Sequence, residues 1–326
     1  MTNPDGHFAS VIQTSSTAYG SAYSLRRFAF LSNSDRNYLL QSATGVLMES
    51  LFFNLAQRLG CLQIIECGAH DAATSQKFVS LTSGRALAIE ANPFVHSKYK
   101  EGLIETSVDY RSIGLAKTRA KMEINIPSHH TNESSLEASL KKRDDFKNYR
   151  SVYIDVDTLD AVSEDFVDRD PTCLWIDVEG LGGEVLEGAR NVLNNPNLKL
   201  IYIEVQEEGA YYSEEHSAFE ISEELANFNF LPIARDYPAS DLYNLLFVRT
   251  ESYGACTTEL SQFWIRYANL KVPFIRFRSP RDLAAVIKNS LIGSRKSMKP
   301  TPLDYLFAAI GSKSSSQRIA DWKVNR

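Results

Sequence analysis

The chain has 326 residues, of which 44% are apolar and 23% are charged, enough for one large α/β domain with additions or for two small domains. The net charge of −5 is uneven: residues 1–249 hold 22 Lys and Arg against 35 Asp and Glu, whereas residues 250–326 hold 13 against 5. An acidic body argues against nucleic acid as the main partner. No run of about 18 apolar residues occurs, so no transmembrane segment is predicted.

The N-terminus and the cysteines bear on cellular location. The first residues lack the basic-then-apolar order of a secretory signal. The four cysteines, Cys61, Cys67, Cys173 and Cys256, are scattered without a C-x-x-C pair, and two of them lie in apolar runs typical of strands. We expect buried, reduced thiols in a cytoplasmic protein.

The predicted elements begin after a polar, irregular stretch over residues 1–33. Apolar residues recur at helical spacing from Ser34 to Gly60, where the glycine suits a C-cap. Strands and helices then alternate. Strands are predicted over residues 61–67, 86–91, 107–115, 121–127, 172–179 and 199–206, with a short one within 152–162. Helices are predicted over residues 72–83, 94–103, 182–194 and 217–229, and a polar loop with a short helix over 127–149.

Apolar strands separated by helices indicate a parallel sheet covered on both faces. Residues 231–235 and 243–249 are typical of a closing antiparallel pair. Beyond residue 250 the pattern becomes helical, with helices expected over 257–270 and from Ser279 and Thr301. We therefore expect an N-terminal segment and helix over residues 1–60, a main domain over 61–250 and a basic α-helical extension over 251–326.

A carboxylate lies close to the end of four of the predicted strands: Glu66, Glu90, Asp177 and Glu204. Ligands of parallel α/β sheets bind at the carboxyl ends of the strands. These four side chains are therefore expected to line a binding site.

The segment QIIECGAHDAATS, residues 63–75, carries the first strand–helix turn. It has one glycine at the turn, Gly68, where a dinucleotide fingerprint has three, and it is acidic where a pyrophosphate would lie. The sulfonium and ammonium groups of S-adenosylmethionine suit such a loop better than NAD does. Glu90, about 20 residues on, can accept both ribose hydroxyls. The expected cofactor-binding residues are Glu66, Gly68, Ala69, Glu90, Ala91 and Asn92.

Five segments taken together resemble the FkbM-type S-adenosylmethionine-dependent methyltransferases in order and spacing. They are IIECGAHDAATSQKF, AIEANPFVHSKY, VDTLDAV, LWIDVEGLGGEVLEGARNVL and LIYIEV, within roughly residues 60 to 250. The resemblance implies a Rossmann-like class I methyltransferase sheet with helices on both faces, here with α-helical N- and C-terminal additions. It also implies O-methylation of a sugar, glycan or natural product.

The sequence departs from the usual family pattern in three places. The stretch from Glu66 to Ala72 reads E-C-G-A-H-D-A where D-x-G-A-N-x-G is usual. Trp175 stands where lysine is frequent, and a glycine pair is added at 182–183.

Methyl transfer to a hydroxyl requires alignment with the sulfonium and removal of a proton. Asp177 and Glu179 are the first catalytic candidates, and His70 is a further candidate base because histidine titrates near neutral pH. Glu204 can complete a carboxylate cluster that acts as a base or binds Mg²⁺, with Asp177 and Glu204 as ligands in that case. Capping of a following helix is the alternative role for Asp177.

The polar loop offers other candidates, since His129 and His130 are possible bases and Asn132 and Ser135 possible ligand contacts. Surface histidines and a capped short helix are the alternatives there.

Three uses compete for residues 251–326: a lid on the core, a subunit interface, or a basic face for an anionic partner. We expect packing with homodimer formation, because clustered aromatics suit an interface. An NAD-dependent oxidoreductase and a catalytically silent binding module remain the rival functions.

Overall fold

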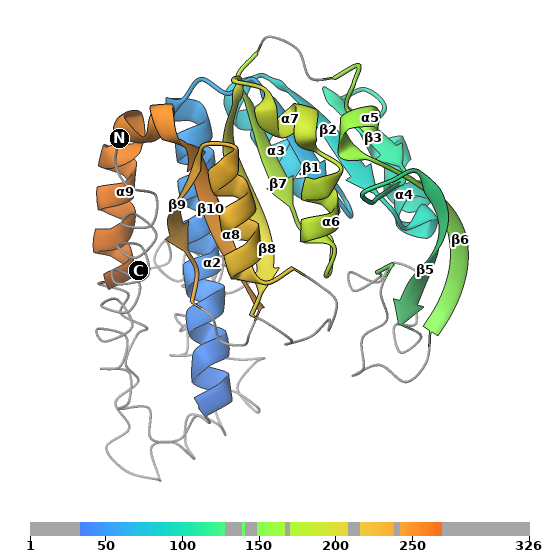
Figure 1. The fold of residues 1–326 in the computed structure, drawn as a ribbon, viewed down its shortest axis with the longest axis horizontal. Coiled ribbons are helices and arrows are strands. Elements are labelled where there is room, and N and C mark those ends of the chain that lie inside the picture. Colours follow the sequence, from blue (N-terminus) through green and yellow to red (C-terminus); the bar gives the residue numbers. More distant parts are fainter. Residues whose placement is uncertain are drawn as a thin grey trace, which may run out of the picture.

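The structure is a computed structural model that describes residues 33–127, 139–140, 149–166, 170–207, 216–237 and 242–268. Its centre is a seven-stranded sheet in the order β3-β2-β1-β7-β8-β10-β9 (Figure 1). The strands are β1 (Gln63–Cys67), β2 (Arg85–Glu90), β3 (Val108–Ser112), β7 (Thr172–Ile176), β8 (Leu198–Gln206), β9 (Phe230–Arg235) and β10 (Leu242–Arg249). Neighbouring strands are parallel except at β10, which is antiparallel to both β8 and β9. The expected parallel sheet with a closing antiparallel pair is confirmed.

Helices cover both faces of this sheet, which explains why its central strands are mostly apolar. On β1, Ile64 packs toward α2 (Asn33–Arg58), α3 (Ala73–Thr82) and α9 (Tyr253–Ala268), in one buried cluster. The next residue, Ile65, belongs to a second cluster on the other face. That face is covered by α5 (Leu159–Val162), α6 (Gly182–Glu187), α7 (Arg190–Asn194) and α8 (Ala218–Asn227). Side chains alternate between faces along a strand, so burial on both faces requires apolar residues at nearly every position.

A second, three-stranded sheet is inserted between β3 and β7. It consists of β4 (Gly114–Leu115), β6 (Tyr149–Asp157) and β5 (Ala120–Pro127), in that order. The strand expected over residues 107–115 is therefore divided between two sheets, at Ile113. Of the predicted polar loop, Ser139 and Leu140 are described, and Ser139 pairs with Asn125 of β5. Figure 1 shows β5 and β6 projecting beside the main sheet near α4 (Pro93–Tyr99), which is followed by a 3-10 helix, η2 (Lys100–Leu103).

The helix expected over residues 182–194 is broken into α6 and α7. A Cβ at Gly188, between them, would lie 2.6 Å from the carbonyl oxygen of Ala116, so a close approach of two backbones fixes the break. The Asp160 carboxylate accepts the backbone N–H groups of Asn191 and Val192 and so caps the first turn of α7.

The helical additions at both ends of the domain pack against each other. Helix α9 lies beside α2 (Figure 1), and its Phe263 and Tyr267 are buried in the same cluster as Phe52 of α2. Another short 3-10 helix, η3 (Thr250–Ser252), links β10 to α9. Phe274 and Phe277, which belong to the aromatic cluster of the extension, and the helices expected from Ser279 and Thr301 lie outside the described residues.

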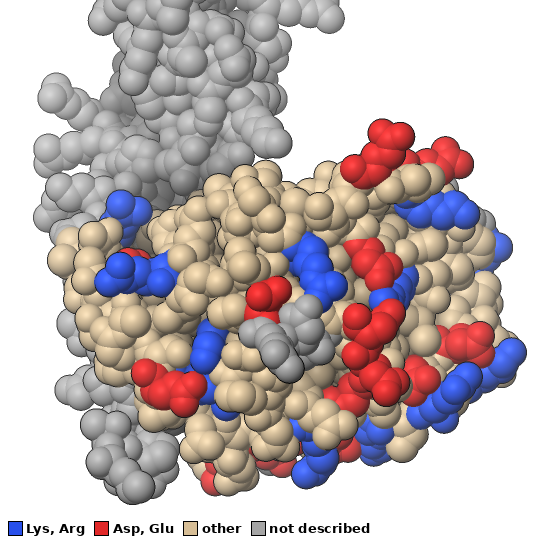
Figure 2. Space-filling view, turned by 90° about the horizontal axis from the view of Figure 1, so that it is seen from above, with Lys and Arg blue, Asp and Glu red and all other residues tan. Residues whose placement is uncertain are grey.

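The surface and the cysteines complete the description. On the face drawn in Figure 2, the described Lys and Arg side chains are spread among Asp and Glu rather than gathered in one patch. None of the helices in the described ranges has the length and hydropathy needed to cross a membrane. All four cysteines are buried free thiols, as expected.

Candidate active site

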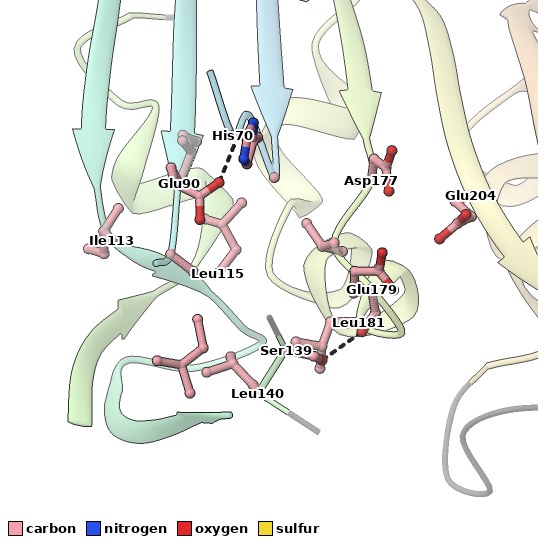
Figure 3. A pocket seen from close by; sticks show the side chains of 15 residues that line it. His70, Glu90, Ile113, Leu115, Ser139, Leu140, Asp177, Glu179, Leu181 and Glu204 are labelled. Carbon is pink, nitrogen blue, oxygen red and sulfur yellow. Dashed lines mark hydrogen bonds between the residues drawn. The ribbon is translucent and has the colours of Figure 1, made fainter. Parts of the chain in front are cut away.

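A cavity of about 290 Å³ opens at the carboxyl ends of β1, β2, β7 and β8. One wall carries Glu90 and His70, and the opposite wall carries Asp177, Glu179 and Glu204 (Figure 3). Apolar side chains line the space between these walls: Ile89, Ile113, Leu115, Ile124, Leu140 and Leu181. A concave, partly apolar site with a few convergent polar groups is typical of small-molecule binding.

Gly68 forms the turn where β1 leaves the sheet. Its φ is 81°, and a Cβ there would lie 1.7 Å from the carbonyl oxygen of Asp177. The Asp177 N–H in turn donates to the Cys67 carbonyl at 3.0 Å. Glycine at this position lets the exits of β1 and β7 pass in contact.

Glu90 ends β2 and is held by two backbone donors. One carboxylate oxygen accepts the His70 N–H at 2.8 Å, and the other accepts the Asn92 N–H at 2.6 Å. A carboxylate has about four acceptor sites, so each oxygen can still accept one hydroxyl. Burial raises the pKa of Glu90, and the two N–H donors oppose that rise. The side chain is thus a fixed acceptor at the edge of the cavity.

Glu66 lies below the cavity rather than in its lining. Its carboxylate accepts the Ser75 N–H, in the first turn of α3, at 2.8 Å. The N-cap residue Ala72 has no side-chain acceptor for the N–H groups of this turn. Burial raises the pKa of Glu66 to about 7, against the lowering effect of the hydrogen bonds from Ser75 and Thr74. Glu66 therefore holds the start of α3.

Of the residues predicted to bind the cofactor, some line the cavity and others, like Glu66, are buried outside it. Gly68, Glu90 and Ala91 line the cavity. Ala69 is buried away from it, and Asn92 is fully buried as the N-cap of α4, where its side chain accepts the Phe94 N–H.

His70 lines the cavity on the Glu90 side. Its φ of 46° lies in the left-handed region, and its backbone carbonyl accepts the hydroxyl of Tyr110. The ring Nε2 is buried without a hydrogen-bond partner among the described residues. Figure 3 shows His70 across the cavity from the three clustered carboxylates, so the structure does not bring it to the other catalytic candidates.

Three carboxylates meet on the opposite wall. Oxygens of Asp177, Glu179 and Glu204 lie within 4.8 Å of one another. Asp177 directly follows β7, and Glu204 lies level with it on β8 because Trp175 pairs with Tyr202 two residues earlier. The Asp177 side chain is open to the cavity, and the protein packed around it raises its pKa to about 6 by disfavouring the charged form. This group of acids can accept a proton near neutral pH or coordinate a hard cation.

The turn that carries Glu179 has an unusual backbone. Glu179 has a φ of 45° and Gly180 a φ of 88°. The Glu179 carbonyl accepts the hydroxyl of Ser139 at 2.7 Å, as the dashed line in Figure 3 marks. Ser139 and the apolar wall residues Ile113, Leu115, Ile124 and Leu140 were not predicted. Strands over residues 121–127 and within 152–162 were predicted, but their periodicity does not show that they pair in a separate sheet beside the cavity.

Two of the departures from the usual family pattern have structural reasons. Trp175 stacks on Tyr202 with ring centroids 3.7 Å apart, in the buried cluster beneath α2. A Cβ at Gly183 would lie 2.3 Å from the His216 ring, so the added glycine makes room for that histidine. The predicted loop residues His129, His130, Asn132 and Ser135 lie outside the described residues.

The solved structures that match the chain include three methyltransferases, all at low identity. Magnesium protoporphyrin IX methyltransferase from Synechocystis with bound SAM has 9% identity and a TM-score of 0.37 over 64% of this chain and 80% of that one. Human N-acetylserotonin methyltransferase in complex with SAM has 10% identity and a TM-score of 0.32 over 67% and 56%. The 1,6-didemethyltoxoflavin-N1-methyltransferase from Burkholderia thailandensis, with 1,6-didemethyltoxoflavin and S-adenosylhomocysteine bound, has 12% identity and a TM-score of 0.32 over 76% and 89%.

No curated protein sequence matches the chain. The profile of the methyltransferase FkbM domain matches residues 66–232, just over half of the 326 residues. This span runs from the end of β1 into β9 and contains every residue described above as lining the cavity. With the strand order of the sheet, it confirms the expected class I methyltransferase fold. The chain belongs to the methyltransferase FkbM domain family.

Proposed function

We propose that the chain is an S-adenosylmethionine-dependent O-methyltransferase that acts on a hydroxyl of a sugar, glycan or natural product. The observation that carries the proposal is one cavity with Glu90 on one wall and three clustered carboxylates on the other. The first wall offers acceptors for an adenosine, and the second offers a proton acceptor for the group to be methylated. Family membership supports methyl transfer as the reaction.

The cofactor in this proposal lies along β1 and β2. The two ribose hydroxyls donate to Glu90, whose oxygens keep acceptor capacity beyond the two N–H groups they already bind. Ile113 and Leu115 supply the apolar surface for the adenine. His70 contacts the cofactor rather than the acceptor, because it lies on the Glu90 side and has a buried ring nitrogen in need of a partner.

The transfer itself is an in-line displacement. The acceptor oxygen forms a bond to the methyl carbon, the carbon–sulfur bond breaks, and adenosylhomocysteine leaves as a neutral thioether. The hydroxyl proton passes to Asp177, whose pKa of about 6 suits a base at neutral pH. Glu179 and Glu204 orient the hydroxyl in this scheme. A Mg²⁺ ion held by Asp177 and Glu204 would lower the pKa of the hydroxyl instead, and a chelator separates the two schemes.

Calorimetry with adenosylhomocysteine and NAD tests the cofactor. We expect micromolar binding of adenosylhomocysteine, about −8 kcal/mol, and no comparable binding of NAD. Glu90→Ala should weaken the binding by about 1.5–3 kcal/mol through loss of charge-assisted hydrogen bonds. Glu101→Ala, an exposed carboxylate on η2, is the matched control and should bind like the wild type. The proposal is contradicted if NAD binds as tightly as adenosylhomocysteine, or if neither ligand binds.

Turnover tests the chemistry and excludes a silent module. Release of adenosylhomocysteine is measured with a panel of methyl glycosides, oligosaccharides and polyhydroxylated natural products. With the acceptor found, Asp177→Asn should fold normally and lose on the order of a hundredfold in rate. Asp155→Asn, on the exposed surface of β6, should keep its rate. Loss of activity with EDTA and its return with Mg²⁺ would support the metal scheme, and a near-normal Asp177→Asn enzyme removes Asp177 from the mechanism.

The proposed compartment is the cytoplasm, where a reducing environment keeps thiols free. All four cysteines are buried thiols without a disulfide, which supports this placement.

A further inference from the structure

The turn from Asp177 to Gly180 needs support from outside its own segment. Strand β7 ends at Ile176, so the sheet does not hold the residues that follow. Two consecutive residues, Glu179 and Gly180, have positive φ angles of 45° and 88°. A glutamate in the left-handed region is energetically unfavourable and persists where its surroundings fix it.

Ser139 provides such a contact from another part of the fold. Its hydroxyl donates to the Glu179 carbonyl at 2.7 Å, and only 4% of Ser139 is exposed. Its own backbone is fixed on both sides, because its N–H donates to the Asn125 carbonyl at 3.1 Å and its carbonyl accepts the Asn125 N–H at 2.8 Å. The donor is thus placed by β5 before it meets the turn.

Asn125 is fixed in turn by the neighbouring strand. Its side-chain oxygen accepts the Ser151 hydroxyl of β6 at 3.0 Å, and 4% of the residue is exposed. The residues adjacent to this pair, Ile124 and Leu140, line the cavity. The same piece of the inserted sheet therefore forms part of the cavity wall and supports the Glu179 turn.

We propose that Ser139 is a positioning residue for the carboxylate cluster: its hydroxyl, held by the inserted sheet, fixes the turn that brings Glu179 to Asp177 and Glu204. The inference deepens the proposed function and depends on it for its kinetic consequences. Without the hydroxyl the turn can leave the left-handed conformation, and the Glu179 carboxylate then loses its place in the cluster. The cofactor wall, on β1 and β2, stays unchanged.

The test compares Ser139→Ala with Ser163→Ala, which removes a similar buried hydroxyl from another part of the fold. Ser163, the residue after α5, is also buried and does not line the cavity, and its hydroxyl donates to the Leu159 carbonyl at 2.6 Å. Both variants should lose similar stability. Ser139→Ala should also lose about tenfold in kcat through misplacement of Glu179, with KM for adenosylmethionine and Kd for adenosylhomocysteine unchanged. Ser163→Ala should keep its kcat, and Ser139→Thr, which retains the hydroxyl, should recover most of the rate.

A double-mutant cycle shows whether Ser139 acts through Glu179. In a Glu179→Gln background, Ser139→Ala should cause little further loss of kcat, since the carboxylate it positions is already absent. Fully additive losses, or equal kinetics for Ser139→Ala and Ser163→Ala, would overturn the inference and leave the proposed function standing.

A crystal structure of Ser139→Ala gives a result without an acceptor. Glu179 should leave the left-handed region and move away from Asp177 and Glu204. An unchanged turn in that variant overturns the inference, whereas absence of any methyl transfer by the wild type, with the turn displaced in the variant, overturns the proposed function alone.

Discussion

At the scale of single residues, the buried Glu66 makes stability depend on pH. Its pKa in the folded chain, about 7, lies above the ordinary carboxyl value of 4.5. Between these values the folded state holds a proton that the unfolded state has lost, so stability should fall as the pH rises from about 4.5 to about 7. Glu66→Gln keeps an acceptor for the Ser75 N–H and removes this ionisation. At pH 8 it should be more stable than the wild type by on the order of 2–3 kcal/mol, measured by urea unfolding.

The same variant separates structure from ligand binding. Asp177 and Asp236 also have raised pKa values, about 6, and contribute a pH dependence of the same sign in both proteins. The difference between wild type and Glu66→Gln therefore belongs to Glu66. Because Glu66 does not line the cavity, adenosylhomocysteine should bind equally to both proteins at pH 8. Weaker binding of adenosylhomocysteine by Glu66→Gln would indicate that Glu66 does contribute to cofactor binding.

The reason for the different place of Glu66 is strand register. The sequence alone predicts that Glu66, Glu90, Asp177 and Glu204 lie close to the ends of strands. In the sheet, Glu66 pairs with Ala88 and Trp175, and Gly68, two residues on, is therefore level with Glu90 and Asp177. Periodicity shows which residues form a strand but not how neighbouring strands align. Glu90, Asp177 and Glu204 line the cavity as predicted, whereas Glu66 lies two residues before the strand ends, inside the sheet.

At the scale of elements, Arg249 joins several helix and strand ends on the edge of the sheet opposite the cavity. It is buried, and its guanidinium donates to the carbonyls of Leu198, Phe228, Leu193 and Asn195 at 2.7–3.2 Å. It also lies over the Phe230 ring at 4.4 Å. Arg249→Met should lower the free energy of unfolding by on the order of 3–5 kcal/mol, because four carbonyls lose a charged donor.

Two further variants define what Arg249 contributes. Arg249→Lys should recover little of the loss, since one ammonium cannot reproduce the planar set of donors. Arg266→Met, on an exposed position of α9, should change stability by less than about 0.5 kcal/mol. If Arg249→Met melts at the same temperature as Arg266→Met, the four carbonyls find other hydrogen-bond partners and the assigned role of Arg249 is wrong.

Element boundaries were predicted less well than element types, for reasons visible in the structure. Residues 107–115 were predicted as one strand, and nothing local in their sequence marks Ile113 as the point where the chain leaves one sheet for another. The break between α6 and α7 depends on contacts of Gly188 and Asp160 with residues distant in sequence. The closing pair β9 and β10 was predictable because both strands and their connection are local.

At the scale of the whole molecule, the described part of the C-terminal extension belongs to the core. Four side chains of α9 are buried against α2 and the sheet: Cys256, Leu260, Phe263 and Tyr267. The family profile ends at residue 232, so this packing lies beyond it. Every residue that lines the cavity precedes the expected boundary at residue 251, but the buried core continues beyond that boundary to Tyr267.

Two truncated chains test this arrangement and the expected homodimer. A chain ending at Ala268 keeps α9 and should melt cooperatively near the wild-type Tm and bind adenosylhomocysteine normally. A chain ending at Ser252 exposes the face of α2 that α9 covers. Loss of that burial, about 1.5–3 kcal/mol for each large apolar side chain, should lower the Tm sharply and reduce solubility.

Light scattering then locates the subunit contact. If residues 269–326 form the interface, the full chain should have twice the mass of one subunit, and the chain ending at Ala268 the mass of a single one. Retention of the dimer by the shorter chain would place the interface within the described residues, and a monomeric full chain would remove the dimer from the proposal. If α9 is part of the core, its removal must cost stability, because Phe263 and Tyr267 are buried in it. A chain ending at Ser252 that melts like the wild type would therefore show that α9 adds nothing to the core.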